Sequence, residues 1–167
     1  SSTTPWRSVG RAAWGSSNRA AQVSTQAARA GDTVIVRAGT YSTAGTDNRW
    51  DLAYNPPNSG TASAPIVFPA EGTVVLTLSS SRGPVIGAWT RDYIVWRGFT
   101  VNEAQAPTHA DTGPAVLSGT VGSAIEDCIL DGNGDPGYGD NHPGIRIEQA
   151  RQVVARNNRI SNFRTST

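Results

Sequence analysis

The residues best suited to acid–base chemistry lie in one Gly-rich run between positions 131 and 142. Tyr138 stands two residues before Asp140, and His142 stands two residues after it. A phenol, a carboxylate and an imidazole are groups that carry general acid–base catalysis. The run therefore predicts Tyr138, Asp140 and His142 as catalytic candidates. Gly and Asp also form turns readily, so a purely structural loop is the alternative.

A second carboxylate has an equivalent position. Asp111 and Asp140 each lie three residues before a proline, Pro114 and Pro143 respectively. If these prolines begin neighbouring turns of a repeated fold, the two carboxylates lie about 5 Å apart. Such a pair either shares a cation such as Ca²⁺ or raises the pKa of one carboxyl group. Asp111 and Asp140 are therefore candidate metal ligands, and calcium is the candidate cofactor.

Four further side chains suit the binding or chemistry of a sugar chain. Trp89 offers an aromatic face, and Glu148 and Arg156 offer groups that bind hydroxyls or carboxylates, so these three are candidate substrate-binding residues. Arg146 is a candidate catalytic cation, because proton abstraction next to a carboxylate builds negative charge that a cation stabilises. An ordinary surface tryptophan and an ordinary ion pair are the alternative interpretation.

An internal repeat predicts what positions these side chains. Pro84, Pro114 and Pro143 begin three segments at offsets of 30 and 29 residues, and a later triplet aligns at 29 and 30: Arg97, Glu126 and Arg156. Each unit has β-branched pairs and Gly or Asn turns, without the 3.6-residue period of a helical solenoid. We therefore expect three short strands per unit, stacked as the coils of a parallel β-helix.

Period-two alternation predicts which side chains of each coil face the core. The expected inward columns are Ile86, Val116 and Ile145, and beside them Ala88, Ser118 and Ile147. The expected outward columns are Gly87, Leu117 and Arg146, and beside them Trp89, Gly119 and Glu148. Further buried residues are expected at Ile94, Trp96, Ile125 and Ala155, with Cys128 buried between the levels of Phe99 and Asn158.

The first third of the chain predicts a different set of elements. Residues 18–30 have helical spacing, with Ser17 or Asn18 as N-cap and Gly31 at the C-terminal end, so we expect one short helix there. A strand is expected over residues 32–41 and a long loop over 42–64. Two strands, 66–68 and 74–76, follow on either side of residues 69–72.

Composition limits the classes of partner. The chain has 167 residues, a net charge of +1 and 14 cationic residues, all of them Arg. This size suits one domain, and the near-neutral balance argues against nucleic acid or an anionic membrane as partner. No apolar run approaches 18 residues and no signal-peptide pattern is present, so we expect a soluble segment.

The segments 30–41, 144–148 and 153–160 resemble right-handed parallel β-helix proteins of the pectate lyase-like superfamily, and the resemblance extends over roughly residues 18–163. It implies an all-β, right-handed parallel β-helix with a short N-terminal capping helix, and an extracellular or periplasmic location. The superfamily includes polysaccharide lyases, glycoside hydrolases, uronate epimerases and phage tailspikes. The Tyr138, Asp140 and His142 run resembles the epimerase motif, with each spacing one residue shorter.

Two functions remain open at this level. The first is a carbohydrate-active enzyme, a polysaccharide lyase or glycoside hydrolase acting on an acidic polysaccharide. The second is a non-catalytic structural or glycan-binding β-helix, similar to a tailspike or adhesin. Residues 1–167 are expected to form one domain that is the N-terminal part of a longer solenoid. An uncovered last coil would then associate end to end or be continued by a further segment.

Overall fold

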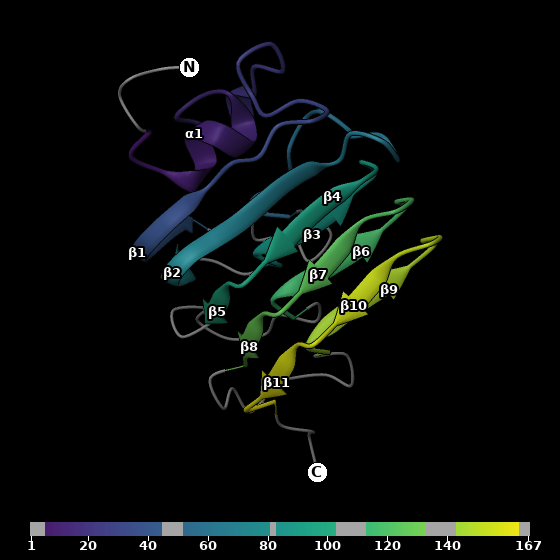
Figure 1. Ribbon diagram of the computed structural model, residues 1–167. Coiled ribbons are helices and arrows are strands. Elements are labelled where there is room, and N and C mark those ends of the chain that lie inside the picture. Colours follow the sequence, from purple (N-terminus) through teal and green to yellow (C-terminus); the bar gives the residue numbers. More distant parts are fainter. Residues whose placement is uncertain (1–5, 45–51, 81–82, 103–112, 133–142, 164–167) are drawn as a thin grey trace.

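The computed structural model describes residues 6–44, 52–80, 83–102, 113–132 and 143–163. Within these ranges the protein is mostly β, with parallel sheets and one short N-terminal α-helix (Figure 1). The helices are α1 (Val9–Trp14) and a single 3₁₀ turn (Arg19–Ala21). The strands are β1 (Val36–Ala44), β2 (Ile66–Ser80), β3 (Ile86–Trp89), β4 (Ile94–Arg97), β5 (Thr100–Asn102), β6 (Ala115–Ser118), β7 (Ala124–Glu126), β8 (Ile129–Asp131), β9 (Ile145–Glu148), β10 (Val154–Arg156) and β11 (Arg159–Ser161).

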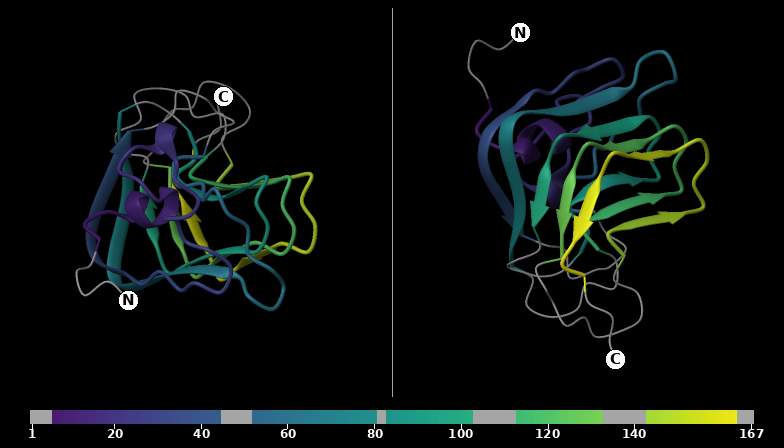
Figure 2. Two further views of the ribbon diagram at one scale, coloured as in Figure 1. Left: turned by 90° about the horizontal axis from the view of Figure 1, so that it is seen from above. Right: turned by 60° about the horizontal axis from the view of Figure 1, so that its bottom comes forward.

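The strands repeat as three stacked coils, β3–β4–β5, β6–β7–β8 and β9–β10–β11. Each strand pairs in parallel with its equivalent in the next coil, which gives the orders β3-β6-β9, β2-β4-β7-β10 and β2-β5-β8-β11. The two views in Figure 2 show the coils lying one above another around a common interior. The sequence repeat of 29 to 30 residues is therefore one coil of the stack.

Left-handed backbone conformations recur at the corners of each coil. Three columns of residues with positive φ stack at the same corners: Thr90, Gly119 and Gln149; Tyr93, Gly122 and Gln152; and Gly98, Asp127 and Asn157. A corner that needs positive φ favours Gly, Asn and Asp, and five of these nine positions have one of them. The chain turns at these corners so that the next strand joins a different sheet.

Aromatic side chains fill the interior near the N-terminal end. Phe68 and Trp96 are register partners on β2 and β4, and their rings stack at 4.3 Å between centroids. The buried indole nitrogen of Trp96 donates a hydrogen bond of 2.8 Å to the carbonyl of Gly87. Gly87 has φ of +143°, and a Cβ there would lie 1.8 Å from the carbonyl oxygen of Val116. Glycine at this position thus permits both the inward carbonyl and the close approach of β6.

The short helix lies earlier than the sequence predicts. Helix α1 begins after Ser8, whose hydroxyl accepts a hydrogen bond from the Arg11 amide, and ends at Gly15 in the left-handed conformation. Residues 18–30 form only the 3₁₀ turn and bends, so the prediction of a helix there is wrong. The reason is tertiary: amides of this segment bind the carbonyls of Ala12 and Trp14 at the end of α1.

Other boundaries in this first part also differ from the predictions. The predicted strands 66–68 and 74–76 belong to one strand, β2, which pairs first with β4 and then with β5. The predicted loop 42–64 is partly core: Leu52, Ala53 and Tyr54 are buried, and the amides of Ala53 and Tyr54 bind the carbonyls of Pro84 and Val85. Apolar burial overrides the polar composition of this segment.

The predicted inward columns are wrong by one residue in the middle coil. Ile86 pairs with Ala115, which pairs with Ile145, and Ala88, Leu117 and Ile147 form the second core column. Val116 and Ser118 instead pair with residues of the outward columns, and Leu117 belongs to the core. The prolines misled the alignment, because the strand begins one residue after Pro114 but two residues after Pro84 and Pro143.

The interior of the last coil is open. Ile94, Trp96 and Ile125 are buried as predicted, but Ala155, the register partner of Ile125, is exposed. Ala155 continues the core column of Trp96 and Ile125, so the prediction that its side chain faces the core is right and the prediction that it is buried is wrong. Burial in a stack requires a coil on both sides, and among the described residues β9, β10 and β11 have a neighbour on one side only.

Candidate functional site

Four of the predicted site residues cannot be placed. Asp111, Tyr138, Asp140 and His142 lie outside the described residues. Their predicted roles as catalytic groups and as calcium ligands therefore stay predictions. Within the described part of the chain, no group of three His, Cys, Asp or Glu side chains gathers as a metal site would require.

The anchors of the two segments that carry these residues are described. Residues 103–112 connect β5 to β6, and residues 133–142 connect β8 to β9. Asn102 and Asp131, just before the two segments, are register partners, and so are Ala115 and Ile145 after them. Both segments therefore start and finish one coil apart, about 4.8 Å along the stack. The anchors are offset by 29 residues before the segments (Asn102 and Asp131) and by 30 after them (Ala115 and Ile145), so the equivalence of Asp111 and Asp140 stays a prediction.

Arg146, Glu148 and Trp89 share the sheet β3-β6-β9. Arg146 and Glu148 lie two residues apart on β9, and their side chains form an ion pair of 2.7 Å. Trp89 pairs with Ser118, which pairs with Glu148, so Trp89 and Glu148 occupy one column two coils apart. The structure thus brings three of the predicted residues onto one face.

Asn55 positions Trp89, although no sequence pattern selects Asn55 as a candidate site residue. The Asn55 side chain accepts a hydrogen bond of 3.1 Å from the Trp89 amide and donates one of 3.1 Å to the Trp89 carbonyl. This amide replaces the backbone partners that a preceding strand would offer. The only sequence signal is a polar residue followed by two prolines in a segment predicted to be a loop.

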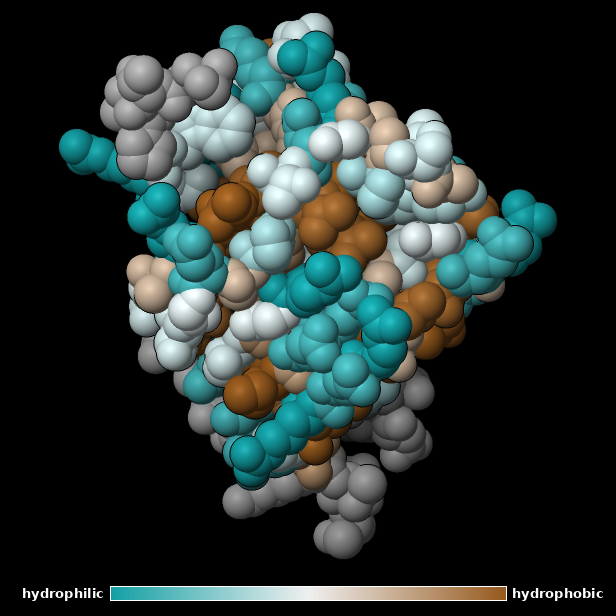
Figure 3. Space-filling model, in the orientation of Figure 1, coloured by the Kyte–Doolittle hydropathy of each residue, from teal (hydrophilic) through white to brown (hydrophobic). Residues whose placement is uncertain are grey.

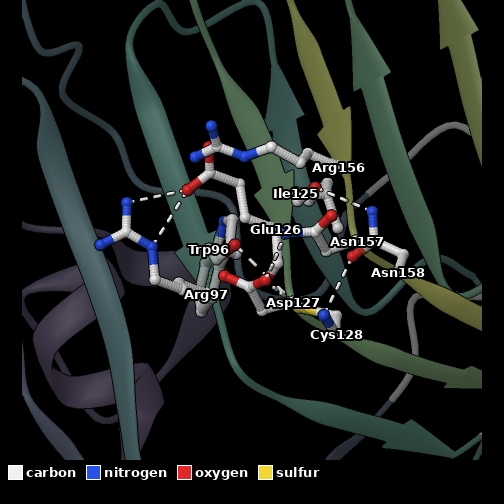
Figure 4. A network of polar contacts seen from close by, with 9 residues as sticks. All are labelled: Trp96, Arg97, Ile125, Glu126, Asp127, Cys128, Arg156, Asn157 and Asn158. Atoms are coloured by element: carbon white, nitrogen blue, oxygen red, sulfur yellow. Dashed lines mark hydrogen bonds and ion pairs between the residues drawn. The ribbon is translucent and has the colours of Figure 1, made fainter.

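Arg156 lies on a different sheet from Trp89. It is on β10, where its guanidinium binds Oε1 of Glu126 at 2.7 Å, while Arg97 binds Oε2 of the same carboxylate through Nη2 at 2.8 Å and Nε at 3.0 Å. Figure 4 shows the two guanidiniums on either side of Glu126. The predicted alignment of Arg97, Glu126 and Arg156 is confirmed by the strand register.

This charged column has a buried centre and exposed ends. The Glu126 side chain is 7% exposed, whereas the side chains of Arg97 and Arg156 are 48% and 59% exposed. Figure 3 shows hydrophilic residues gathered across this face of the molecule. Because both carboxylate oxygens are bound by cations, Glu126 is a structural group and has no free oxygen for proton transfer.

Cys128 lies in the interior, as predicted. Its side chain is buried, its amide binds the side-chain oxygen of Asn158 at 2.9 Å, and the following amide, of Ile129, binds the carbonyl of Phe99. Burial raises the pKa of the Cys128 thiol to about 11. A thiol that stays protonated is a poor nucleophile, so Cys128 is a packing residue.

One hollow in the described part of the chain lies beside the N-terminal helix. It has a volume of about 750 Å³ and lies between α1 and β1, lined by residues such as Val9, Ile35 and Tyr41. None of the predicted site residues borders it. The described residues include no helix of the length and apolar character needed to cross a membrane.

No protein-family model, no curated protein and no solved structure matches this chain. The assignment of a function therefore rests on the geometry above.

Proposed function

We propose that this chain is a right-handed parallel β-helix of the pectate lyase-like type that acts on an acidic polysaccharide outside the cytoplasm. The stacked parallel coils and the N-terminal helix support this fold. The sheet β3-β6-β9 and the segments 103–112 and 133–142 form the proposed site. The observation that carries the proposal is the anchoring of these two segments on adjacent coils at the edge of that sheet.

The proposed chemistry follows from the residues assigned to this edge. His142 or Tyr138 would remove the proton next to a uronate carboxylate, and Asp111 and Asp140 would hold a calcium ion. Arg146, on β9 directly after the second segment, would stabilise the charge that develops. Trp89 and Glu148 extend the face along the stack and would hold neighbouring sugar rings.

The test separates the proposed site from the rest of the surface. Asp140→Ala, His142→Ala and Arg146→Ala are assayed on pectate, alginate and glycosaminoglycans by the ultraviolet absorbance of unsaturated uronates, with a reducing-end assay for hydrolysis. Arg159→Ala is the matched control, because this exposed arginine lies on β11, on another sheet. We expect a loss of at least about 100-fold for the first two variants and none for the control. Full activity in both Asp140→Ala and His142→Ala would overturn the proposed catalytic site.

A binding module without catalysis is the second candidate. The observation in its favour is that Arg146 and Glu148 already form an ion pair, as residues of a passive binding face do. It predicts that the unmodified chain cleaves none of the substrates yet binds one of them. In that case Trp89→Ala would weaken binding measured by calorimetry, and Trp6→Ala, at an exposed tryptophan near α1, would not.

A further inference from the structure

The hollow between α1 and β1 is separate from the proposed polysaccharide site. It has a volume of about 750 Å³, and small-molecule sites are clefts of roughly 300 to 1,000 Å³. Both elements that bound it are described, and Figure 1 shows α1 beside β1 at the N-terminal end of the stack. None of the residues on the sheet β3-β6-β9 borders it. Its lining residues therefore suggest a ligand independently of that sheet.

Apolar side chains line two sides of the hollow. Val9 and Ala12 of α1 lie on one side, and residues 34–36, at the start of β1, lie on the other. Val9 and Ala12 are buried, but Ile35 is 58% exposed. An isoleucine exposed to that extent favours a ligand that covers it with apolar surface.

The aromatic side chains of the hollow are held in place by contacts within the chain. The guanidinium carbon of Arg11 lies 5.9 Å from the centroid of the Trp6 ring, and Nη2 of Arg11 donates a hydrogen bond of 2.6 Å to Oε1 of Gln26. The Tyr41 hydroxyl donates a hydrogen bond of 3.0 Å to the carbonyl of Arg37. Both rings are therefore positioned before a ligand binds, which lowers the entropic cost of binding.

Arg7 gives the hollow an available positive charge. Of the other charged lining residues, Asp32 accepts a hydrogen bond of 2.8 Å from a backbone amide, and Arg37 lies 3.8 Å from Glu71. Within the described part of the chain, Arg7 makes no hydrogen bond or ion pair. Residues 6–44 as a whole carry five Arg and one acid. This balance favours a ligand with an anionic group.

We propose that the hollow binds a free fatty acid, with the alkyl chain against Ile35 and the carboxylate on Arg7. An alkyl chain needs no polar partner, and a guanidinium binds a carboxylate through two parallel hydrogen bonds. A sugar fits this lining less well, because the polar side chains of Ser8, Asp32 and Tyr41 already make hydrogen bonds within the chain. The ligand thus differs in class from the proposed polysaccharide.

The probe for this test is decanoate, titrated into the full chain by isothermal titration calorimetry below the concentration at which it forms micelles. Acetate has the carboxylate without the alkyl chain, and decyltrimethylammonium has the alkyl chain with the opposite charge. We expect decanoate to bind saturably at one site. Acetate and decyltrimethylammonium should each bind at least about tenfold more weakly.

Two variants locate the binding to this hollow. Arg7→Ala should weaken decanoate binding about tenfold, and Ile35→Asp should weaken it at least as much, because it removes apolar surface and adds a like charge. The matched controls are Arg29→Ala and Ile129→Asp, at an exposed arginine and an exposed isoleucine that do not border the hollow. Both controls should leave the affinity unchanged. Circular dichroism checks that each variant folds, and the comparison of the three probes needs no variant.

Failure of decanoate to bind, or equal binding of decanoate and decyltrimethylammonium, would overturn the proposal. So would an unchanged affinity in both Arg7→Ala and Ile35→Asp. Phosphatidylglycerol vesicles that bind through Arg7 while monomeric decanoate does not would assign the hollow to a membrane surface instead. Oligogalacturonate that binds through Arg7 more tightly than decanoate would assign it to an acidic sugar. None of these readouts depends on cleavage of a polysaccharide, so this proposal and the proposed function fail separately.

Discussion

Among the described residues, Glu126 is the charged residue that is buried. Its two oxygens are bound by guanidiniums from the coils on either side. Removing one member of such a set leaves the others without compensation in a region of low dielectric constant. Because the two arginines remain half exposed, water offsets part of that loss.

Glu126→Ala should therefore lower the free energy of unfolding by about 2 kcal/mol, measured by urea denaturation. The matched control is Glu71→Ala, because Glu71 also pairs with an arginine, Arg37, at 3.8 Å, but both side chains are largely exposed. We expect the control to change stability by less than about 0.5 kcal/mol. Equal effects would mean that the buried column contributes no more than a surface pair.

Cys128 makes the stability depend on pH in the alkaline range. Its thiol pKa is raised by burial to about 11 in the folded chain, so the unfolded chain loses the thiol proton at lower pH. The contribution to stability is complete below the unfolded pKa and is lost as pH rises through the folded value. We expect the free energy of unfolding to fall between about pH 9 and pH 11. The free energy of unfolding of the Cys128→Ala variant should fall less steeply over that range of pH. An identical slope would contradict the raised pKa of the buried thiol.

At the scale of elements, the stack depends on close approaches that a side chain would block. Gly87 combines a positive φ with a backbone contact to β6 and a carbonyl that accepts the Trp96 indole hydrogen bond. Gly39, on β1, has a similar φ of +152°, but a Cβ there would meet only the Tyr41 ring, at 3.6 Å. Substitution of Gly87 and of Gly39 by Ala therefore separates the cost of a steric clash from the cost of an unfavourable backbone conformation.

Gly87→Ala should cost about 3 kcal/mol or more in unfolding free energy, because β3 and β6 would have to separate and the indole would lose its acceptor. Gly39→Ala should cost about 1 kcal/mol, the conformational part alone. Thermal unfolding would measure both losses. If Gly39→Ala lowered the free energy of unfolding more than Gly87→Ala, the contact between β3 and β6 would have to relax easily.

At the scale of the whole molecule, burial depends on how many coils cover a residue. Ala88, Leu117 and Ile147 occupy one core column in three successive coils. Leu117 is fully buried, whereas Ile147 is 49% exposed at the open end. Apolar side chains that face the core in the same column therefore contribute differently to the free energy of unfolding in different coils.

Leu117→Ala should lower the free energy of unfolding by about 3 kcal/mol, and Ile147→Ala by less than about 1 kcal/mol, in chemical denaturation. This comparison also checks the register, since the sequence alone placed Leu117 on the outer face. If Leu117→Ala were neutral, the outward assignment would be restored. If Ile147→Ala cost as much as Leu117→Ala, the open end would have to be covered in solution.

The sequence was enough to predict the repeat, the parallel stacking of equivalent strands, the alignment of Arg97 with Glu126 and Arg156, and the burial of Cys128. These follow from a period of 29 to 30 residues, which every coil must satisfy in turn. The position of the helix, the register of Ala115 and Leu117, and the exposure of Ala155 depend on packing between segments that are distant in the sequence. A proline fixes a turn but not the number of residues before the strand begins. The burial of a side chain depends on whether another coil covers it, and a local sequence pattern does not predict this.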